Sequence, residues 1–406
     1  MTYAAVHNPY KCRQCGFCSD IVACPGADEL ICLGCGACVL ACPNGALELV
    51  EDAREGNVTI QVDGKTNQVP ERITVRDALT TLGYLAAATP EDPGLFAPCE
   101  VGGCWACAVE IDGNVIPACR AGVKEGMQIR TELPVDYVPR RIVQGFSGHP
   151  AGGVGTPWSI RSSRSSNHSI LEVVCFATGC NFRCPQCQNW HISFRGTGDA
   201  LTPEDAAKLL TEERESQKVN RLTISGGEST LNRPWLVQFI GQLRALNPDS
   251  EAHFHVDTNG SLLTHSYIDE LVDAGMTDIG IDLKSSDSDI FMKITGLRIR
   301  ELADKHRETA WEAVSYISQE YAGKVFLGVG IPYNRELTNI TELSRMGEKL
   351  LQIDPAIQVT VLNYRDAFRS KIAIPTDHEM QGVRQVMMDL GLKNVICQTT
   401  QGNIGP

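Results

Sequence analysis

Seventeen cysteines are the residues of this chain whose spacing points most directly to chemistry. Eight of them stand in the first fifty residues and repeat one pattern, a C-x2-C-x2-C triplet followed by a Cys-Pro pair. Thiolates at every third residue of a short loop can bind three corners of a four-iron cluster, while the Cys-Pro member reaches across to the other cluster. The two copies consist of Cys12, Cys15, Cys18 and Cys24, and of Cys32, Cys35, Cys38 and Cys42.

The crossed arrangement assigns these eight thiols to two [4Fe–4S] clusters. The ligands are Cys12, Cys15, Cys18 and Cys42 for one cluster, and Cys32, Cys35, Cys38 and Cys24 for the other. The segment resembles a bacterial-type two-cluster ferredoxin, with five residues between Cys18 and Cys24 where the second copy has three. A pair of zinc sites is the alternative, but zinc motifs usually supply thiolates as C-x2-C pairs. Because so short a segment buries little apolar surface, we expect the clusters to hold it together.

Four further cysteines follow a different pattern, C-x4-C-x2-C with a fourth thiol after eleven more residues. This is the plant-type spacing of a [2Fe–2S] cluster, and a zinc site is the alternative. The four are Cys99, Cys104, Cys107 and Cys119. Residues 57–67 alternate around an Asp-Gly turn as a two-stranded ribbon does, and residues 75–85 have a helical pattern, which together suggest a β-grasp fold. Residues 56–132 resemble the [2Fe–2S] ferredoxin-like domains of complex redox enzymes.

A third group, Cys180, Cys184 and Cys187, has C-x3-C-x2-C spacing and no obvious fourth thiol. Three ligands leave one iron of a [4Fe–4S] cluster open. The motif resembles the radical S-adenosylmethionine (SAM) superfamily. In that superfamily the open iron is chelated by the amino and carboxylate groups of SAM before one-electron cleavage to methionine and a 5'-deoxyadenosyl radical. Taken alone, the triplet is also compatible with chance or with zinc.

Gly226, Gly227 and Glu228 stand at the end of the second expected strand after the three-cysteine motif is counted with the first, and they match the superfamily's GGE motif. By that resemblance, their backbone and carboxylate hold the ammonium group of SAM. A GGE sequence is weak evidence in isolation. Its place at the end of the second strand makes it strong.

Two more polar motifs follow the third and fourth strands, Asp257-Thr258-Asn259-Gly260 and Asp282-Leu283-Lys284. Both resemble the pyruvate formate-lyase activating enzyme branch of the superfamily. The likeness implies that Asp257 and Asp282 flank a monovalent cation beside the SAM carboxylate, that Asn259 belongs to the SAM site, and that Lys284 pairs with the carboxylate. Simple turn chemistry is the alternative for Asp257 and Asn259.

The stretch GCNFRCPQCQNW departs from that branch at one position. Gln186 stands where the related proteins have an aromatic residue that packs against adenine. Phe182 or Trp190 are candidates to replace it, or are core residues. The remaining thiols are Cys175, which we expect to be a buried small hydrophobe, and Cys397.

Alternating strands and helices are expected to position the three-cysteine motif and the polar motifs. Expected strands cover residues 171–177, 221–227, 252–258, 278–283, 324–331 and 358–364. Amphipathic stretches at 204–213 and 267–276 lie between them. The pattern predicts an α/β fold, in which a partial (β/α)6 barrel with its site at the carboxyl ends of the strands is preceded by two small α+β ferredoxin-like modules.

The chain therefore divides into four predicted segments. They are a two-[4Fe–4S] module at 1–52, a [2Fe–2S] β-grasp domain at 53–135, a Gly/Ser/Pro-rich linker at 136–170 and a radical SAM core at 171–406.

Composition limits the partners and the compartment. A formal net charge of -13 argues against nucleic acid, because phosphate binding needs a basic face. No apolar run approaches the length of a membrane span, and the N-terminus has no signal-peptide pattern, so we expect a cytoplasmic protein. In such a reducing compartment, clustered cysteines indicate metal or redox chemistry rather than disulfides.

Three functions are compatible with these motifs. The first is a radical SAM enzyme acting on a protein, as an activase or a modifying enzyme, and the activating-enzyme likeness favours it. The second is hydrogen abstraction from a small metabolite, with the auxiliary clusters accepting an electron. The third is an electron-transfer subunit that binds SAM without turnover, which the complete set of motifs disfavours. For either enzyme we expect three [4Fe–4S] clusters, one [2Fe–2S] cluster, SAM and a low-potential electron donor. The segment 362–366 at the sixth strand end, with Tyr364 and Arg365, is the candidate for substrate contact, and a structural turn is the alternative.

Overall fold

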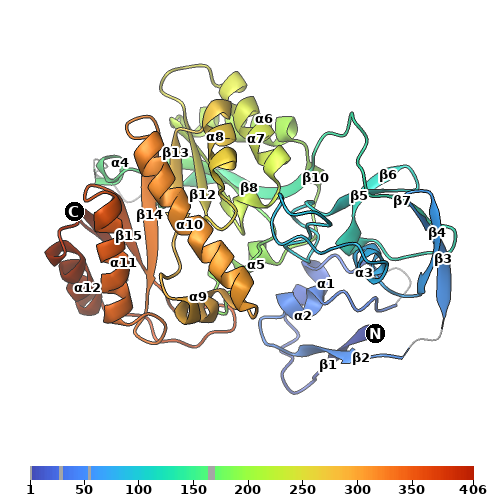
Figure 1. Cartoon of the computed structure of the whole chain (residues 1–406). Coiled ribbons are helices and arrows are strands. Elements are labelled where there is room, and N and C mark those ends of the chain that lie inside the picture. The colour runs from blue at the N-terminus through green and yellow to red at the C-terminus, as the bar shows by residue number, and fades with distance from the viewer. Residues whose placement is uncertain (1, 27–30, 54–55, 163–169) are drawn as a thin grey trace. The chain divides into compact units, whose positions relative to one another are not determined.

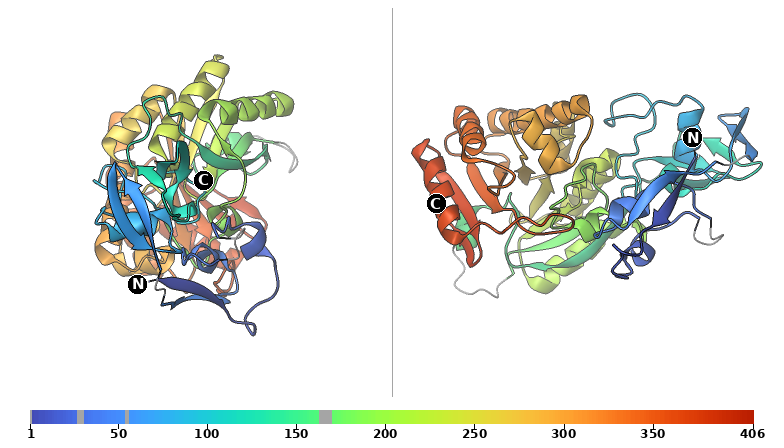
Figure 2. Two further views of the ribbon diagram at one scale, coloured as in Figure 1. Left: turned by 90° about the vertical axis from the view of Figure 1, so that its right-hand side faces the viewer. Right: turned by 90° about the horizontal axis from the view of Figure 1, so that it is seen from below.

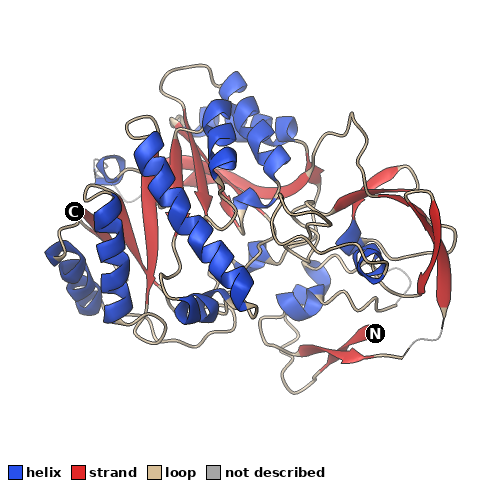
Figure 3. Ribbon diagram, in the orientation of Figure 1, coloured by secondary structure: helices blue, strands red, loops and turns tan. Residues whose placement is uncertain are grey.

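The computed structural model describes residues 2–26, 31–53, 56–162 and 170–406, and the chain forms two compact units (Figure 1). The first unit contains residues 1–144, 177–181 and 189–202, and the second contains residues 145–176, 182–188 and 203–406. The first unit consists largely of loops around short elements, whereas helices and strands alternate through the second (Figure 3). None of the described helices is long and apolar enough to cross a lipid bilayer.

The amino-terminal part of the first unit has the internal duplication that its cysteines predict. Strands β1 (Tyr3–His7) and β2 (Leu47–Glu51) pair antiparallel, and each cysteine triplet continues into a short helix, α1 (Phe17–Asp20) or α2 (Ala37–Ala41). The helices follow Gly16 and Gly36, whose φ values of 72° and 78° are costly for any residue with a Cβ. Only a few apolar side chains, such as Phe17 and Ala41, are buried here.

The rest of the first unit contains a five-stranded sheet of order β4-β3-β7-β5-β6. Its elements are β3 (Asn57–Val62), β4 (Lys65–Pro70), α3 (Val75–Thr81), β5 (Ala108–Ile111), β6 (Asn114–Pro117), the 3-10 helix η1 (Ala118–Arg120) and β7 (Gln128–Arg130). Strand β3 pairs parallel with β7, and the other pairs are antiparallel. Thr74 caps α3 by accepting the Asp77 N–H, and Leu79 lies in the core with Cys107 and Cys119. The ribbon and helix are thus where the sequence predicts them.

In the second unit, strands β11 to β16 pair in parallel in chain order, with β9 beside β11. Helices accompany these strands through the green-to-red part of the chain (Figure 2), and the predicted α/β class is confirmed. Its strands are β9 (Glu172–Ala177), β11 (Arg221–Gly226), β12 (His253–Thr258), β13 (Asp278–Asp282), β14 (Phe326–Tyr333), β15 (Gln358–Asn363), β16 (Asn394–Thr399) and the antiparallel β17 (Gly402–Ile404). Its long helices are α6 (Pro203–Gln217), α7 (Arg233–Leu246), α8 (His265–Ala274), α9 (Ser288–Thr295), α10 (Arg300–Glu320), α11 (Ile340–Ile353) and α12 (Asp377–Asp389). All six predicted strands are present.

The prediction of a linker at residues 136–170 is wrong for much of its length. Residues 141–149 form strand β8 (Arg141–His149), which lies in the sheet between β9 and the short β10 (Ala200–Leu201), and Trp158–Ser162 form α4. Residues 163–169 of this segment lie outside the described residues.

The loop after β8 enters the interior of the sheet. A Cβ on Gly328 would come within 2.1 Å of the Val154 carbonyl oxygen, and a Cβ on Gly155 within 2.4 Å of His255 Nε2. The small residues that suggest a linker are therefore required for close backbone packing.

Candidate functional site

The first unit gathers twelve of the seventeen cysteines into three sets. The first set, called the Cys18 set, consists of Cys12, Cys15, Cys18 and Cys42. Burial raises the pKa of Cys18, and the negative charges of Cys42, Cys15 and Cys12 raise it further. The backbone N–H groups of Gln14 and Ala46 donate to Cys12 and Cys42, each at 3.3 Å. Mutual proximity and N–H···S bonds fit thiolates that hold a cluster.

The second set, called the Cys38 set, consists of Cys24, Cys32, Cys35 and Cys38. Burial raises the pKa of Cys38 to about 12, with Cys35, Cys32 and Cys24 adding to the shift. The Ala5 N–H donates to Cys32 Sγ at 3.2 Å. In each set, therefore, thiols of one copy interact electrostatically with the Cys-Pro thiol of the other copy, and their assignment to a cluster stays a prediction.

The third set, called the Cys104 set, consists of Cys99, Cys104, Cys107 and Cys119, which are all at most 3% exposed. Cys104 donates to Cys99 across 3.1 Å. Hydrogen bonds from Cys104 and Cys119 hold the pKa of Cys99 well below its ordinary value. Four thiols that share one buried pocket fit the donor set of a [2Fe–2S] cluster.

The three-cysteine motif is divided between the units: Cys180 belongs to the first, and Cys184 and Cys187 belong to the second. In the second unit, the loop of Cys184 and Cys187 is fastened to the end of α9. Arg183 N–H donates to the Thr295 carbonyl at 2.7 Å, and Gln186 Nε2 donates to the Ile294 carbonyl at 2.8 Å. The buried Gln186 side chain therefore fixes the loop, and it provides no aromatic ring to pack against adenine.

The two aromatic candidates to replace a ring at Gln186 are both engaged in packing. Phe182 meets Phe291 edge-on, with ring centroids 5.6 Å apart. Trp190 lies against Phe17 in the first unit at 4.5 Å. Phe182 is 2% exposed, in line with the core role that the sequence leaves open as an alternative, whereas Trp190 is only partly buried.

Glu228 is 1% exposed and ties together the ends of two strands. Its Oε1 accepts the backbone N–H and the hydroxyl of Thr230, and the hydroxyl of Thr258, at 2.6 to 2.9 Å. Its Oε2 accepts the Asn259 N–H at 2.7 Å. Because both oxygens are engaged within the protein, the Glu228 side chain positions the loop after β11.

Gly226 and Asn259 have mainly local conformational roles. Gly226 ends β11 with a φ of 125°, a value that strongly favours glycine. The Asn259 side chain accepts the Ser261 N–H at 2.9 Å, which is the turn chemistry that the sequence left as the alternative. Gly227 follows Gly226 in the same turn and is partly exposed.

Asp257 is placed by a buried histidine that the sequence reasoning missed. His255 Nε2 lies 3.0 Å from Asp257 Oδ1, and His255 Nδ1 lies 3.6 Å from Glu172 Oε2. Burial opposes protonation of His255, but the two carboxylates outweigh it and raise its pKa to about 9. The available signal was the alternation of His253, His255 and Asp257, since alternate residues of a strand share one face.

Lys284 brings together the fourth strand and the cysteine loop. Its Nζ donates to the Tyr364 hydroxyl at 2.9 Å and lies 3.5 Å from Asp282 Oδ2. Burial disfavours the ammonium form, but Tyr364, Asp282 and Cys184 outweigh this effect and raise the Lys284 pKa well above its usual value. In turn, burial raises the pKa of Cys184 to about 12 while Lys284 opposes the shift.

Asp282 offers an unused acceptor beside this lysine. Among the described residues, its Oδ1 atom is buried without a hydrogen-bond partner. A Cβ at Gly330 would come within 2.2 Å of the same atom, so the glycine preserves the space beside it. A buried, unsatisfied carboxylate oxygen favours a cationic ligand. The pocket chemistry therefore fits the predicted cation or ammonium group.

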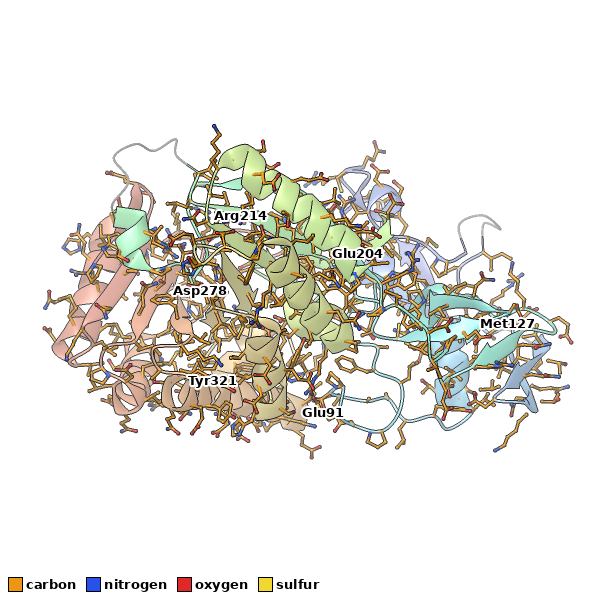
Figure 4. The ribbon with its side chains drawn as sticks, turned by 90° about the horizontal axis from the view of Figure 1, so that it is seen from above. Glu91, Met127, Glu204, Arg214, Asp278 and Tyr321 are labelled. Atoms are coloured by element: carbon orange, nitrogen blue, oxygen red, sulfur yellow. The ribbon has the colours of Figure 1, made fainter. Side chains whose placement is uncertain are left out.

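A buried ion network joins the opposite, amino ends of three of these strands. Asp278, labelled in Figure 4, lies 3.0 Å from Arg221 Nη1, and Arg221 Nε lies 3.7 Å from Glu172. All three side chains are at most 2% exposed. The Arg221 guanidinium also donates to the Gly155 carbonyl at 3.2 Å, which fastens the loop after β8.

Comparison with known families agrees with these cysteine patterns. Residues 174–342 match the Radical SAM superfamily. Residues 55–134 match the 2Fe-2S iron-sulfur cluster binding domain, and residues 25–48 match the 4Fe-4S binding domain.

The curated relatives cover part of the chain. It is 32% identical over 120 residues to a GTP 3',8-cyclase of Rhizobium meliloti (strain 1021), covering 29% of this chain and 33% of that protein. It is 31% identical over 138 residues to a probable GTP 3',8-cyclase of Thermoplasma volcanium, covering 34% and 39%. The chain thus spans between a third and two fifths of the length of these relatives.

Solved structures provide more distant similarities. Streptococcus suis SuiB bound to S-adenosylmethionine aligns with a TM-score of 0.43 and 15% identity, covering 56% of this chain and 50% of that one. HydG, a maturase of the [FeFe]-hydrogenase, aligns with a TM-score of 0.42 and 16% identity, covering 56% and 52%.

Proposed function

We propose that the chain is a radical SAM enzyme that cleaves SAM reductively, because residues 174–342 match that superfamily. The observation that carries this proposal is the shared site in the second unit. Lys284 from the end of β13 interacts electrostatically with Cys184 and hydrogen-bonds to Tyr364, beside the unsatisfied oxygen of Asp282. A cysteine loop and complementary charges thus occupy one end of a parallel sheet.

The residues of this end have distinct proposed roles. Cys180, Cys184 and Cys187 would hold a [4Fe–4S] cluster, and the backbone of Gly226 and Gly227 would receive the SAM ammonium group. Asp257 and Asp282 would border the cation site, and Lys284 would pair with the SAM carboxylate. Glu228 and Asn259 keep the loops in place. When bound together, cluster and SAM supply a 5'-deoxyadenosyl radical for hydrogen abstraction.

The three cysteine sets of the first unit would hold two [4Fe–4S] clusters and one [2Fe–2S] cluster. We propose that they relay electrons from a low-potential donor. The grouping of four thiols in each set and the matches to both kinds of iron–sulfur domain support this assignment.

Two substrate classes follow from different observations. The relatives named GTP 3',8-cyclase favour a small molecule for this chain, and we adopt that class as the first candidate. The activating-enzyme likeness of GCNFRCPQCQNW favours a protein substrate, which is the second candidate. The buried anchoring role of Gln186 counts against the second, because it removes the aromatic contact typical of that branch.

The first experiment measures SAM cleavage. The full chain is purified without oxygen, its iron is quantified, and 5'-deoxyadenosine is measured after reduction by dithionite. We expect about 14 irons per chain from the cluster types. Cys184→Ala should abolish the product, whereas Cys397→Ala, which alters a buried thiol outside the motif, should retain it. Full iron content without cleavage, with or without added extract, would refute the proposed activity.

The second experiment separates the substrate classes. Extract from the source organism is divided by size, and each fraction is tested for stimulation of 5'-deoxyadenosine formation, with GTP as a defined small-molecule probe. Stimulation by the small-molecule fraction supports the first candidate. Stimulation confined to the protease-sensitive macromolecular fraction would replace it with the second.

A further inference from the structure

Arg76 is a buried positive charge in the β-grasp domain, on helix α3 (Figure 1). Its side chain is 17% exposed and pairs with Asp77 at 2.9 Å and with Glu100 at 3.3 Å. A guanidinium does not lose its proton in proteins. The two carboxylates therefore fix the position of a permanent cation.

This cation faces the Cys38 set. Arg76 and Cys35 both line a cavity of about 440 Å³ that also includes Asp77 and Glu100. Burial raises the pKa of the Cys35 thiol, and the charge of Arg76 acts in the opposite direction. The guanidinium field thus reaches a thiol of one four-cysteine set.

The same cation faces the Cys104 set. Helix α3 packs on η1, which carries Cys119, and the Val75 N–H donates to the Ala121 carbonyl at 2.8 Å. Glu100, which pairs with Arg76 at 3.3 Å, directly follows Cys99, a member of the Cys104 set. One side chain therefore acts on two different cysteine sets.

The loops of these two sets are in direct contact. Leu33 lies between Cys32 and Cys35, and Gly122 lies three residues after Cys119. A Cβ on Gly122 would come within 2.8 Å of Leu33 Cδ1, so the glycine allows the leucine to approach. The two sites are neighbours within the first unit.

We propose that Arg76 provides one fixed positive charge to two sites, and that this charge raises the reduction potentials of the clusters at the Cys38 set and at the Cys104 set together. An added electron makes a cluster more negative, and a fixed nearby cation stabilises that state. The inference rests on the proposed function only in taking the two cysteine sets as cluster ligands. It makes these clusters a matched pair, separate from the Cys18 set.

The test is a redox titration of the full, iron-loaded chain followed by electron paramagnetic resonance. In Arg76→Gln, the midpoint potentials of the [2Fe–2S] signal and of one [4Fe–4S] signal should both fall. Arg76→Lys should restore most of the shift, because it keeps the charge. The matched control is Arg72→Gln, whose side chain is 50% exposed, and it should leave all potentials unchanged. Unchanged potentials in Arg76→Gln, or a shift at one cluster alone, would overturn the proposal.

A second variant keeps the test decisive if Arg76→Gln loses its iron. Glu100→Gln removes a negative charge from the same cavity, so both potentials should rise. The absence of a rise in an iron-replete Glu100→Gln protein would also overturn the proposal. None of these readouts requires SAM cleavage. Failure of the proposed enzyme activity would therefore be visible separately from failure of the Arg76 proposal.

Discussion

The cysteine sets of the first unit and the strand-end site of the second unit are assembled by opposite means. The Cys18 set and the Cys38 set come from one short stretch, residues 12–42, with only short helices and strands around it. The site of the second unit takes Glu228, Asp257 and Lys284 from the ends of successive strands above a buried ion network. We therefore expect the first kind of site to depend on its metal and the second to depend on packing.

Removal of iron should produce the largest difference in amide protection between the two units. After anaerobic chelation, residues 2–53 should lose their amide protection, because few apolar side chains remain to hold them together. Strands β11 to β15 should stay protected, since buried residues such as Val256 and Ile281 stabilise them without metal. Hydrogen exchange with mass spectrometry reads both regions in one sample. Equal loss of protection in both units would abolish the distinction.

The complementary change, Arg221→Met, should lower the stability of the second unit. It removes the guanidinium partner of Asp278 and one of the cations beside Glu172, and loss of one member of a buried ion pair costs about 3–5 kcal/mol in the free energy of unfolding. Urea denaturation followed by tryptophan fluorescence measures the change, and the visible absorption of the first unit's clusters should persist at the urea concentration that unfolds the variant. Arg345→Met is the matched control, because its side chain is 59% exposed. A similar midpoint for both variants would show that the network contributes little.

Lys284→Ala should test the ligand-binding part of the site. Loss of a charge-assisted contact with the SAM carboxylate is worth about 1.5–3 kcal/mol, or about a 10- to 150-fold weaker Kd for SAM. Lys284→Arg should recover part of the affinity, and the exposed Lys324→Ala should retain all of it. Equilibrium binding of SAM to the iron-loaded protein provides the measurement. Wild-type affinity in Lys284→Ala would remove this lysine from the SAM site.

The sequence predicted the features that depend on local spacing. All three four-cysteine sets, the β-grasp ribbon and the six strands were visible as short patterns, because thiol spacing and strand periodicity are local properties. The role of residues 141–158 was not visible, because glycine permits both flexible linkers and tight packing. Likewise, the contacts of Lys284 with Tyr364 and of Arg76 with Glu100 join distant positions, and residue type alone does not specify them.

A mild acid shift should weaken the second unit through His306, with the smallest effect of the four. His306 is 2% exposed, with Nδ1 3.2 Å from the Ser261 carbonyl, and burial lowers its pKa to about 4. The unfolded chain protonates this histidine near pH 6.5, so its stabilising contribution is complete above that pH and is lost as the pH falls towards 4. By pH 5.5 the loss is about 1 kcal/mol. His306→Gln should flatten this dependence in urea denaturation between pH 7.5 and 5.5, and the exposed His378→Gln should not. An unchanged slope in His306→Gln would assign the acid sensitivity of this unit to other groups.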